Sequence, residues 1–222
     1  HDDRPDRDRR LRRGQSDLGA EAFAHVGAEA TLARRPEDLR RAAGIVVPGV
    51  GHFSATRALG APWRDAVRAA LGAGRPLLGI CLGMQWLFEG SEEAPDVPGL
   101  GLFRGRSARL TGPVKVPHIG WNTLELRRRA PIVEGVADGA SVYFVHSYAV
   151  PVGPETVAVT THGGAFASVV AGEGVYGVQF HPEKSGPAGL RMLANFVALV
   201  RASRRAAARG GSDPDARAGA AG

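Results

Sequence analysis

The only cysteine of the 222-residue chain, Cys81, stands in a setting that suits a nucleophile. It lies in the segment Gly79-Ile80-Cys81-Leu82-Gly83, between an apolar run at 76–80 that predicts a buried strand and a helix-forming run at 84–89. A cysteine at a strand-to-helix turn, with a glycine two residues before it and another two residues after it, has the spacing of a nucleophile elbow. A lone cysteine is more often inert core filler, and this segment alone leaves the two interpretations about evenly balanced.

A histidine and a carboxylate follow a second apolar strand. The predicted strand at 175–180 ends in His181-Pro182-Glu183. The carboxyl ends of neighbouring parallel strands share one edge of a sheet, so His181 can reach Cys81 and accept its proton while Glu183 orients the imidazole. Taken alone, this pair would be a surface histidine and a helix-start carboxylate. Combined with the elbow, it predicts a Cys-His-Glu catalytic triad.

A loop rich in glycine follows the apolar strand at 44–47. It contains Gly49, Val50 and Gly51 and lacks the lysine of a phosphate-binding loop. We expect its backbone N–H groups, together with the amide of Leu82, to stabilise an oxyanion beside the nucleophile. Gln85, one turn into the elbow helix, is a candidate substrate contact.

The remaining histidines give no separate catalytic signal. His118 and His146 have no carboxylate two residues on, and we interpret them as structural or substrate-loop residues. The histidines and the cysteine show no metal-ligand spacing such as C-x-x-C or H-E-x-x-H. The sequence therefore predicts neither a metal nor another cofactor.

Helices and strands alternate in the part of the chain that must position these residues. This alternation predicts an α/β fold, with a parallel sheet covered by helices on both faces and ligands at the carboxyl ends of its strands. The expected helices are 18–26, which Asp17 can cap, 36–43, 63–71, 84–89 and 188–208. The expected strands are 28–33, 44–47, 76–80, 100–110, 121–126, 141–150, 156–161 and 166–180.

Composition bounds the class of protein. Hydrophobic residues make up 44% of the chain, which suits one globular domain. The net charge of +6 comes mostly from the ends, since residues 1–13 contribute +2 and residues 201–222 contribute +3. Such solvated ends do not form the basic face that nucleic-acid binding requires. We expect disordered segments at 1–13 and 209–222 and one domain at 14–208.

The sequence also argues against a membrane or secreted protein. It contains no apolar run long enough to cross a bilayer and no secretory signal pattern. A single cysteine forms no internal disulfide, which suits a reducing cytoplasm, and we expect a cytoplasmic protein.

The elbow and His181-Pro182-Glu183 resemble the triad of the class I glutamine amidotransferases. Further segments resemble one branch of that family, the glutaminase subunits of imidazole glycerol phosphate synthase in histidine biosynthesis. These segments are 48–51, 116–122, 143–148 and 177–185, and the resemblance covers about residues 14–200. It implies a three-layer, flavodoxin-like sheet with helices on both faces and added antiparallel strands.

The resemblance also implies a reaction and a partner. Cys81 attacks the side-chain amide of glutamine, and the ammonia released passes to a (β/α)8-barrel cyclase subunit, with which the glutaminase forms a heterodimer. The cyclase then makes imidazole glycerol phosphate and an aminoimidazole carboxamide ribotide. Further site positions implied by the resemblance are His146, Ser147 and Tyr148 as substrate contacts, and Trp121 and Lys184 as residues that face the partner.

One departure from the family pattern bears on the fold. The family opens with an apolar strand and an Asn-containing loop, whereas this sequence opens with Arg/Asp-rich residues and has Asp17 where Asn is usual. We therefore expect the sheet to lack its usual first strand. Two alternatives to the leading hypothesis are a triad glutaminase or γ-glutamyl hydrolase that serves another reaction, and a non-catalytic binding module with a glutaminase fold.

Overall fold

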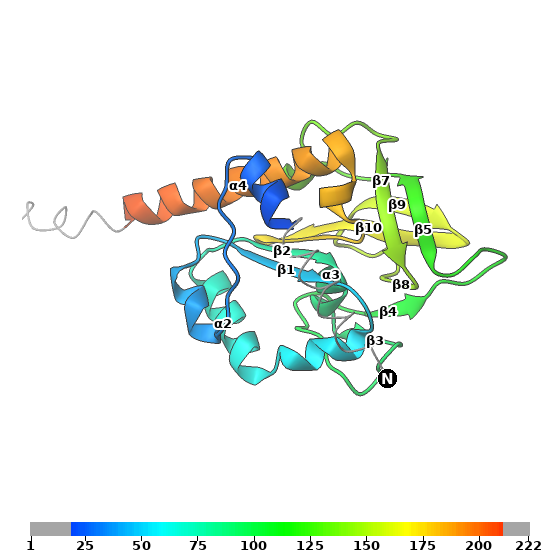
Figure 1. The fold of residues 1–222 in the computed structure, drawn as a ribbon, viewed down its shortest axis with the longest axis horizontal. Helices are drawn as coiled ribbons and strands as arrows, with labels where there is room; N and C mark the ends of the chain where they lie inside the picture. The colour runs from blue at the N-terminus through cyan, green and yellow to red at the C-terminus, as the bar shows by residue number, and fades with distance from the viewer. Residues whose placement is uncertain (1–18, 211–222) are drawn as a thin grey trace, which may run out of the picture.

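The computed structural model describes residues 19–210, and a six-stranded mixed sheet forms its centre (Figure 1). The strands lie in the order β1 (Ile45–Gly49), β2 (Leu77–Cys81), β11 (Val175–Val178), β10 (Gly164–Gly172), β9 (Thr156–His162) and β6 (Glu125–Leu126). The first three strands are parallel, and the other pairings are antiparallel. The expected parallel sheet is thus confirmed for the half that carries the predicted triad.

Helices cover both faces of this sheet, as expected. All five residues of β2 are buried, and its side chains are divided between two apolar clusters on the two faces of the sheet. Leu78 and Ile80 pack in the cluster that includes α4 (Gly186–Gly210) and the helical residues 19–25. Leu77 packs in the cluster that includes α2 (Ala61–Gly72) on the other face (Figure 1). The continuous apolar run in the sequence is therefore a strand that is buried on both faces.

Smaller elements surround the carboxyl end of this sheet. The short helix α3 (Leu82–Trp86) follows β2 directly. A two-stranded ribbon pairs β5 (His118–Thr123) with β7 (Ser141–His146), and a small sheet joins β3 (Gly90–Ser91), β4 (Arg106–Arg109) and β8 (Tyr148–Ala149). The 3-10 helices are η1 (Pro36–Arg41), η2 (Phe53–Ala58), η3 (Pro131–Val133) and η4 (Pro182–Lys184).

Several predicted elements differ from the observed ones. The expected strand at 28–33 is wrong: these residues form no regular element, and Leu32 is 77% exposed, so burial does not hold the segment against the sheet. The expected strand at 166–180 is two strands, because the chain turns at Glu173 and Gly174, both with positive φ. The expected strand at 100–110 is reduced to β4, and the elbow helix ends at Trp86 rather than at residue 89.

The start of the sheet and the two ends of the chain bear on the predicted first strand and the predicted tails. Within residues 19–210, no strand precedes β1, which forms the edge of the sheet. The segments 1–13 and 211–222, and the helix-start residues Asp17 and Leu18, lie outside the described residues. Helix α4 extends through residue 210, so residues 209 and 210 are helical. No helix among the described residues is long and apolar enough to cross a membrane.

Candidate active site

Cys81 occupies a sharp turn at the end of β2. Its backbone has φ 54° and ψ −111°, a conformation that residues with a side chain rarely adopt and that is typical of strained functional positions. The flanking glycines make room for this turn. A Cβ on Gly83 would lie 1.7 Å from the carbonyl oxygen of Val47 in β1, and one on Gly79 would lie 2.7 Å from the backbone of Gly83 and Met84. The elbow predicted from the glycine spacing is therefore present, and close packing requires both glycines.

His181 follows β11, the strand that pairs with β2. Parallel pairing aligns Val178 with Ile80, which brings the residues after both strands to the same edge of the sheet. His181 is 3% exposed, and its Nδ1 lies 2.9 Å from Oε1 of Glu183 in η4. This contact leaves Nε2 for Cys81.

The environment of His181 favours the protonated imidazole. Burial alone would lower its pKa, but hydrogen bonds with Cys81 and Glu183, and the negative charges of those groups, raise the pKa to about 9. His181 therefore carries a proton at neutral pH that it can donate to a leaving group. The structure brings the three predicted triad residues together.

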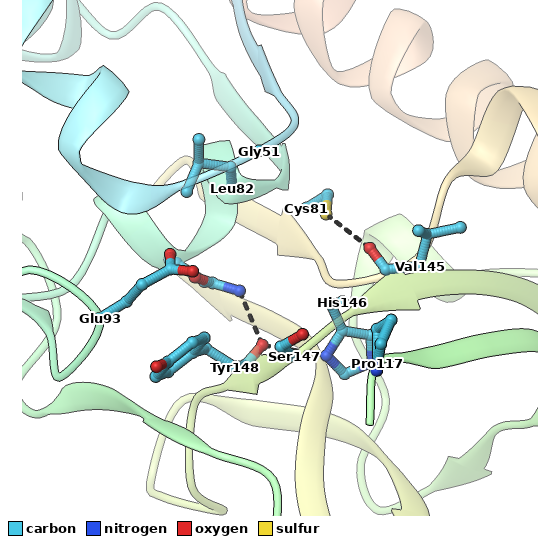
Figure 2. A pocket seen from close by; sticks show the side chains of 10 residues that line it. Gly51, Cys81, Leu82, Glu93, Pro117, Val145, His146, Ser147 and Tyr148 are labelled. Carbon is cyan, nitrogen blue, oxygen red and sulfur yellow. Dashed lines mark hydrogen bonds between the residues drawn. The ribbon is translucent and has the colours of Figure 1, made fainter. Parts of the chain in front are cut away.

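The glycine-rich loop packs against the elbow. A Cβ on Gly49 would lie 2.8 Å from Cβ of Leu82, so this glycine allows the end of β1 to approach the turn closely. Gly51, with φ +93°, lines a cavity together with Cys81 and Leu82 (Figure 2). Gly49 and Val50 do not line it. Of the loop residues predicted to stabilise an oxyanion, only Gly51 borders the cavity.

The cavity beside Cys81 has a volume of about 220 Å³. Its lining includes all four predicted substrate contacts: Gln85, His146, Ser147 and Tyr148. It also includes Glu93, Pro117 and Val145, which were not predicted from the sequence. Glu93 lies across the cavity from Val145 (Figure 2), and its Oε2 accepts a hydrogen bond of 2.7 Å from the backbone N–H of Phe53. The doubled glutamate at 92–93 was the one signal for it in the sequence.

A buried pair of amide side chains, Gln85 and Gln179, forms hydrogen bonds that reach the sulfur of Cys81. The Nε2 group of Gln85 donates to the carbonyl of Tyr148 at 2.8 Å and to Oε1 of Gln179 at 3.1 Å. The Nε2 group of Gln179 in turn donates to the sulfur of Cys81 at 3.6 Å. Gln179 is fully buried, and its role was not predicted from the sequence.

The two residues expected to face a partner lie in different surroundings. Trp121 is 59% exposed on the ribbon, next to Ile119 at 61% and near Val145 at 37%. Lys184 is half-buried in η4. Among residues 19–210, no group of three or more His, Cys, Asp or Glu side chains could hold a metal ion.

Comparisons with known proteins find similar sequences over most of the chain. The family profile described as "Glutamine amidotransferase class-I" matches residues 18–200. The imidazole glycerol phosphate synthase subunit HisH of Thermococcus kodakarensis is 49% identical over 191 residues, which cover 82% of this chain and 97% of that protein. The subunit HisH of Natronomonas pharaonis is 51% identical over 181 residues, which cover 78% of this chain and 84% of that protein.

Solved structures share the fold. A crystal structure of a glutamine amidotransferase superposes with a TM-score of 0.64 at 23% identity, over 83% of this chain and 93% of that one. A protein from Thermoplasma acidophilum, described as a putative GMP synthase component, gives a TM-score of 0.63 at 15% identity, over 86% and 90% of the two chains.

Proposed function

The chain belongs to the class I glutamine amidotransferases and, within them, to the HisH subunits of imidazole glycerol phosphate synthase, and we propose that Cys81, His181 and Glu183 are its catalytic triad. It is the glutamine-hydrolysing subunit of that synthase, in histidine biosynthesis. The observation that carries the triad is geometric: His181 is buried, its Nδ1 lies 2.9 Å from Oε1 of Glu183, and it follows β11, the strand that pairs in parallel with the strand ending at Cys81.

The three residues divide the work of hydrolysis. The sulfur of Cys81 forms a bond to the side-chain carbonyl carbon of glutamine, and the carbonyl electrons move onto oxygen. His181 donates its proton to the amide nitrogen, the C–N bond breaks, and ammonia leaves with a glutamyl thioester on Cys81. His181 then takes a proton from water as the water attacks the thioester, which releases glutamate and restores the thiolate. Glu183 holds the imidazole through Nδ1 in both steps.

The oxyanion formed in each step needs nearby N–H donors. Gly51 and Leu82 border the cavity next to Cys81, so we assign this role to their backbone amides. Gly49 and Val50 position the loop from outside the cavity. The positive φ of Gly51 supports this assignment, because a glycine there can change its peptide orientation at little steric cost.

Glu93 is the residue that we assign to recognition of the charged end of the glutamine substrate. It is the one carboxylate among the described residues that line the cavity, and it lies away from Cys81 (Figure 2). One of its oxygens is occupied by Phe53 N–H, which leaves the other for a cation. We assign it to the α-ammonium group of glutamine, while Gln85, His146, Ser147 and Tyr148 form the wall beside the substrate.

The exposed ribbon is the surface on which we place the cyclase subunit. Ile119 pairs with Val145 across β5 and β7, and Trp121 extends the same apolar patch. Large exposed apolar residues grouped in this way are typical of protein interfaces. The carbonyl of Val145 lies 3.8 Å from the sulfur of Cys81, so the patch is close to the point where ammonia forms. We propose that the partner is a (β/α)8-barrel, that Lys184 also faces it, and that the heterodimer works in the cytoplasm, where Cys81 stays reduced.

Covalent trapping of Cys81 tests the triad. A glutamine analogue that carries an electrophile at the side-chain carbonyl should label the wild-type protein in complex with the cyclase subunit, and peptide mass spectrometry should place the label on Cys81. Cys81→Ser should abolish labelling and hydrolysis, and Glu183→Gln should slow both. A folded wild-type complex that neither hydrolyses glutamine nor accepts the label would overturn the proposal and favour a non-catalytic module.

A further inference from the structure

Two buried histidines connect the ribbon to the cavity wall. His118 on β5 and His146 on β7 are 4% and 5% exposed, and they occupy paired positions in the ribbon. Nδ1 of His118 lies 3.1 Å from Nε2 of His146, and Nδ1 of His146 lies 2.9 Å from the carbonyl oxygen of Tyr148. The triad mechanism uses neither imidazole for proton transfer.

The hydrogen-bond partners of the two imidazole rings determine which nitrogen of each ring carries the proton. A carbonyl oxygen can only accept, so Nδ1 of His146 is the donor to Tyr148, and Nε2 of the neutral ring must accept from Nδ1 of His118. Burial lowers the pKa of His146 to about 3 and that of His118 to about 4, which keeps both rings neutral at pH 7. Both rings are therefore Nδ1–H tautomers.

Asn122 completes the outer end of this arrangement. Its Oδ1 accepts from the backbone N–H of Thr123 at 2.8 Å, which identifies the other end of the amide as Nδ2. The two hydrogens of Nδ2 point to the carbonyl of Thr161 at 3.1 Å and to Nε2 of His118 at 3.3 Å. The acceptor nitrogen of the neutral His118 ring thus has a donor, and each hydrogen of the Asn122 amide makes one hydrogen bond.

The inner end reaches the nucleophile. The carbonyl of Tyr148 accepts from His146 and also from Gln85, and the amide of Gln85 continues through Gln179 to the sulfur of Cys81. We call this set the hydrogen-bond path. It runs, in order, through Asn122, His118, His146, the Tyr148 carbonyl, Gln85, Gln179 and Cys81.

We propose that the hydrogen-bond path holds the sulfur of Cys81 and the cavity wall at Tyr148 in place, and that His118 is a positioning residue for glutamine hydrolysis. This inference rests on the proposed function of Cys81. His118 is not among the residues that line the cavity, so its effect on the reaction passes through His146 and the Tyr148 carbonyl. It also joins the nucleophile to β5, the strand that exposes Trp121.

Substitutions at His118 separate a positioning role from simple packing. Phenylalanine keeps the ring and removes both polar atoms, whereas asparagine places an amide N–H near the former Nδ1 and can still donate to His146. In the complex with the cyclase subunit, we expect His118→Phe to lower kcat for glutamine by about 10- to 100-fold, because displaced reacting groups lose rate steeply. We expect His118→Asn to recover most of that loss. His118→Phe should also slow the alkylation of Cys81 by a neutral haloacetamide more than His118→Asn does.

His162 provides a matched control. Its ring stacks on His118 at a centroid distance of 4.0 Å, but its own hydrogen bond goes to the carbonyl of Lys115, outside the path. His162→Phe keeps the stacking and should leave kcat and the alkylation rate unchanged. Equal losses in His118→Phe, His118→Asn and His162→Phe would reduce His118 to a packing residue, and a wild-type kcat in His118→Phe would overturn the inference.

A measurement on the wild-type protein tests the path without relying on activity or on the folding of a variant. Long-range ¹H–¹⁵N spectra distinguish the two imidazole tautomers, and we expect the Nδ1–H form for both His118 and His146. A proton on Nε2 of either ring would contradict the direction of the path. If the tautomers are as expected and the wild-type complex nevertheless fails to hydrolyse glutamine, then the assignment of Cys81 fails, and with it the positioning role of His118.

Discussion

Replacing Gly83 with alanine should disrupt the nucleophile through a steric clash that the structure defines. The new Cβ would lie 1.7 Å from the carbonyl oxygen of Val47 and 2.7 Å from its carbonyl carbon, whereas ordinary contact begins near 3.4 Å. The elbow and β1 must therefore separate by about 1.7 Å along this contact. Strand β1 is held to β2 at five paired positions, so the turn that carries Cys81 takes up much of the shift.

The expected effects follow from that displacement. Overpacking of a tight site lowers the free energy of unfolding by about 1–3 kcal/mol. A misplacement of about 1 Å at reacting atoms can cost about 100-fold in rate, so we expect kcat for glutamine to fall by at least this factor. Urea unfolding followed by circular dichroism measures the first effect, and ammonia release by the complex with the cyclase subunit measures the second.

The same substitution elsewhere in the chain serves as a control. A Cβ on Gly72, in the last turn of α2, meets nothing within 4 Å. Gly72→Ala should leave kcat unchanged and raise the free energy of unfolding by up to about 1 kcal/mol, because alanine loses less backbone entropy than glycine in a helix. The reasoning is refuted if Gly83→Ala retains both the wild-type kcat and the wild-type stability.

The site supports four further predictions. The pKa of His181 rises from 6.5 to about 9 on folding, so between these pH values the folded state retains a proton that the unfolded chain releases. The free energy of unfolding should therefore fall as the pH rises from about 6.5 to 9. Urea titrations should show a weaker pH dependence in His181→Gln. His118 has the opposite shift, to about 4, so stability should also fall as pH drops from about 6.5 to 4, and His118→Phe should reduce that slope. Glu93→Gln should raise KM for glutamine by about 10-fold or more in steady-state assays while kcat changes little, because a lost charged hydrogen bond costs about 1.5–3 kcal/mol. An unchanged KM would exclude contact between Glu93 and the α-ammonium group. Trp121→Ala should weaken binding of the cyclase subunit by about 2 kcal/mol in calorimetry, as expected for a central interface aromatic, and unaltered affinity would move the interface away from the ribbon.

The placement of the proposed triad residues at one edge of the sheet was predictable, because the signals are local and the rule that joins them is general. Glycines around Cys81 indicate a tight turn, and an apolar run before His181 indicates a buried strand. Parallel strands bring their carboxyl ends to one edge, and the pairing of Gly177 with Gly79 places the two residues there. No knowledge of the intervening chain was needed for this inference.

Gln179 and Glu93 could not be identified in the same way, because their roles depend on long-range register. Gln179 and Cys81 are 98 residues apart, and a glutamine that directly follows an apolar strand carries no sign of which neighbour it will contact. Glu93 follows a short strand and reaches the cavity through its contact with Phe53, 40 residues earlier. The error at 28–33 has a related cause, since strand propensity does not say whether a partner strand and a buried face exist.

The position of Val145 connects the proposed partner surface to the proposed nucleophile. Its side chain is exposed beside Ile119 on the ribbon, while its backbone carbonyl faces the sulfur of Cys81 at 3.8 Å. A strand is stiff along its length, so a partner that shifts the outer face of β7 also shifts this carbonyl, which can accept a hydrogen bond from the thiol but repels the thiolate. Docking on the ribbon and the state of the nucleophile therefore share one structural element. Linkage is reciprocal, so any factor by which the cyclase subunit changes the equilibrium for forming a covalent adduct at Cys81 is also the factor by which that adduct changes the affinity for the subunit.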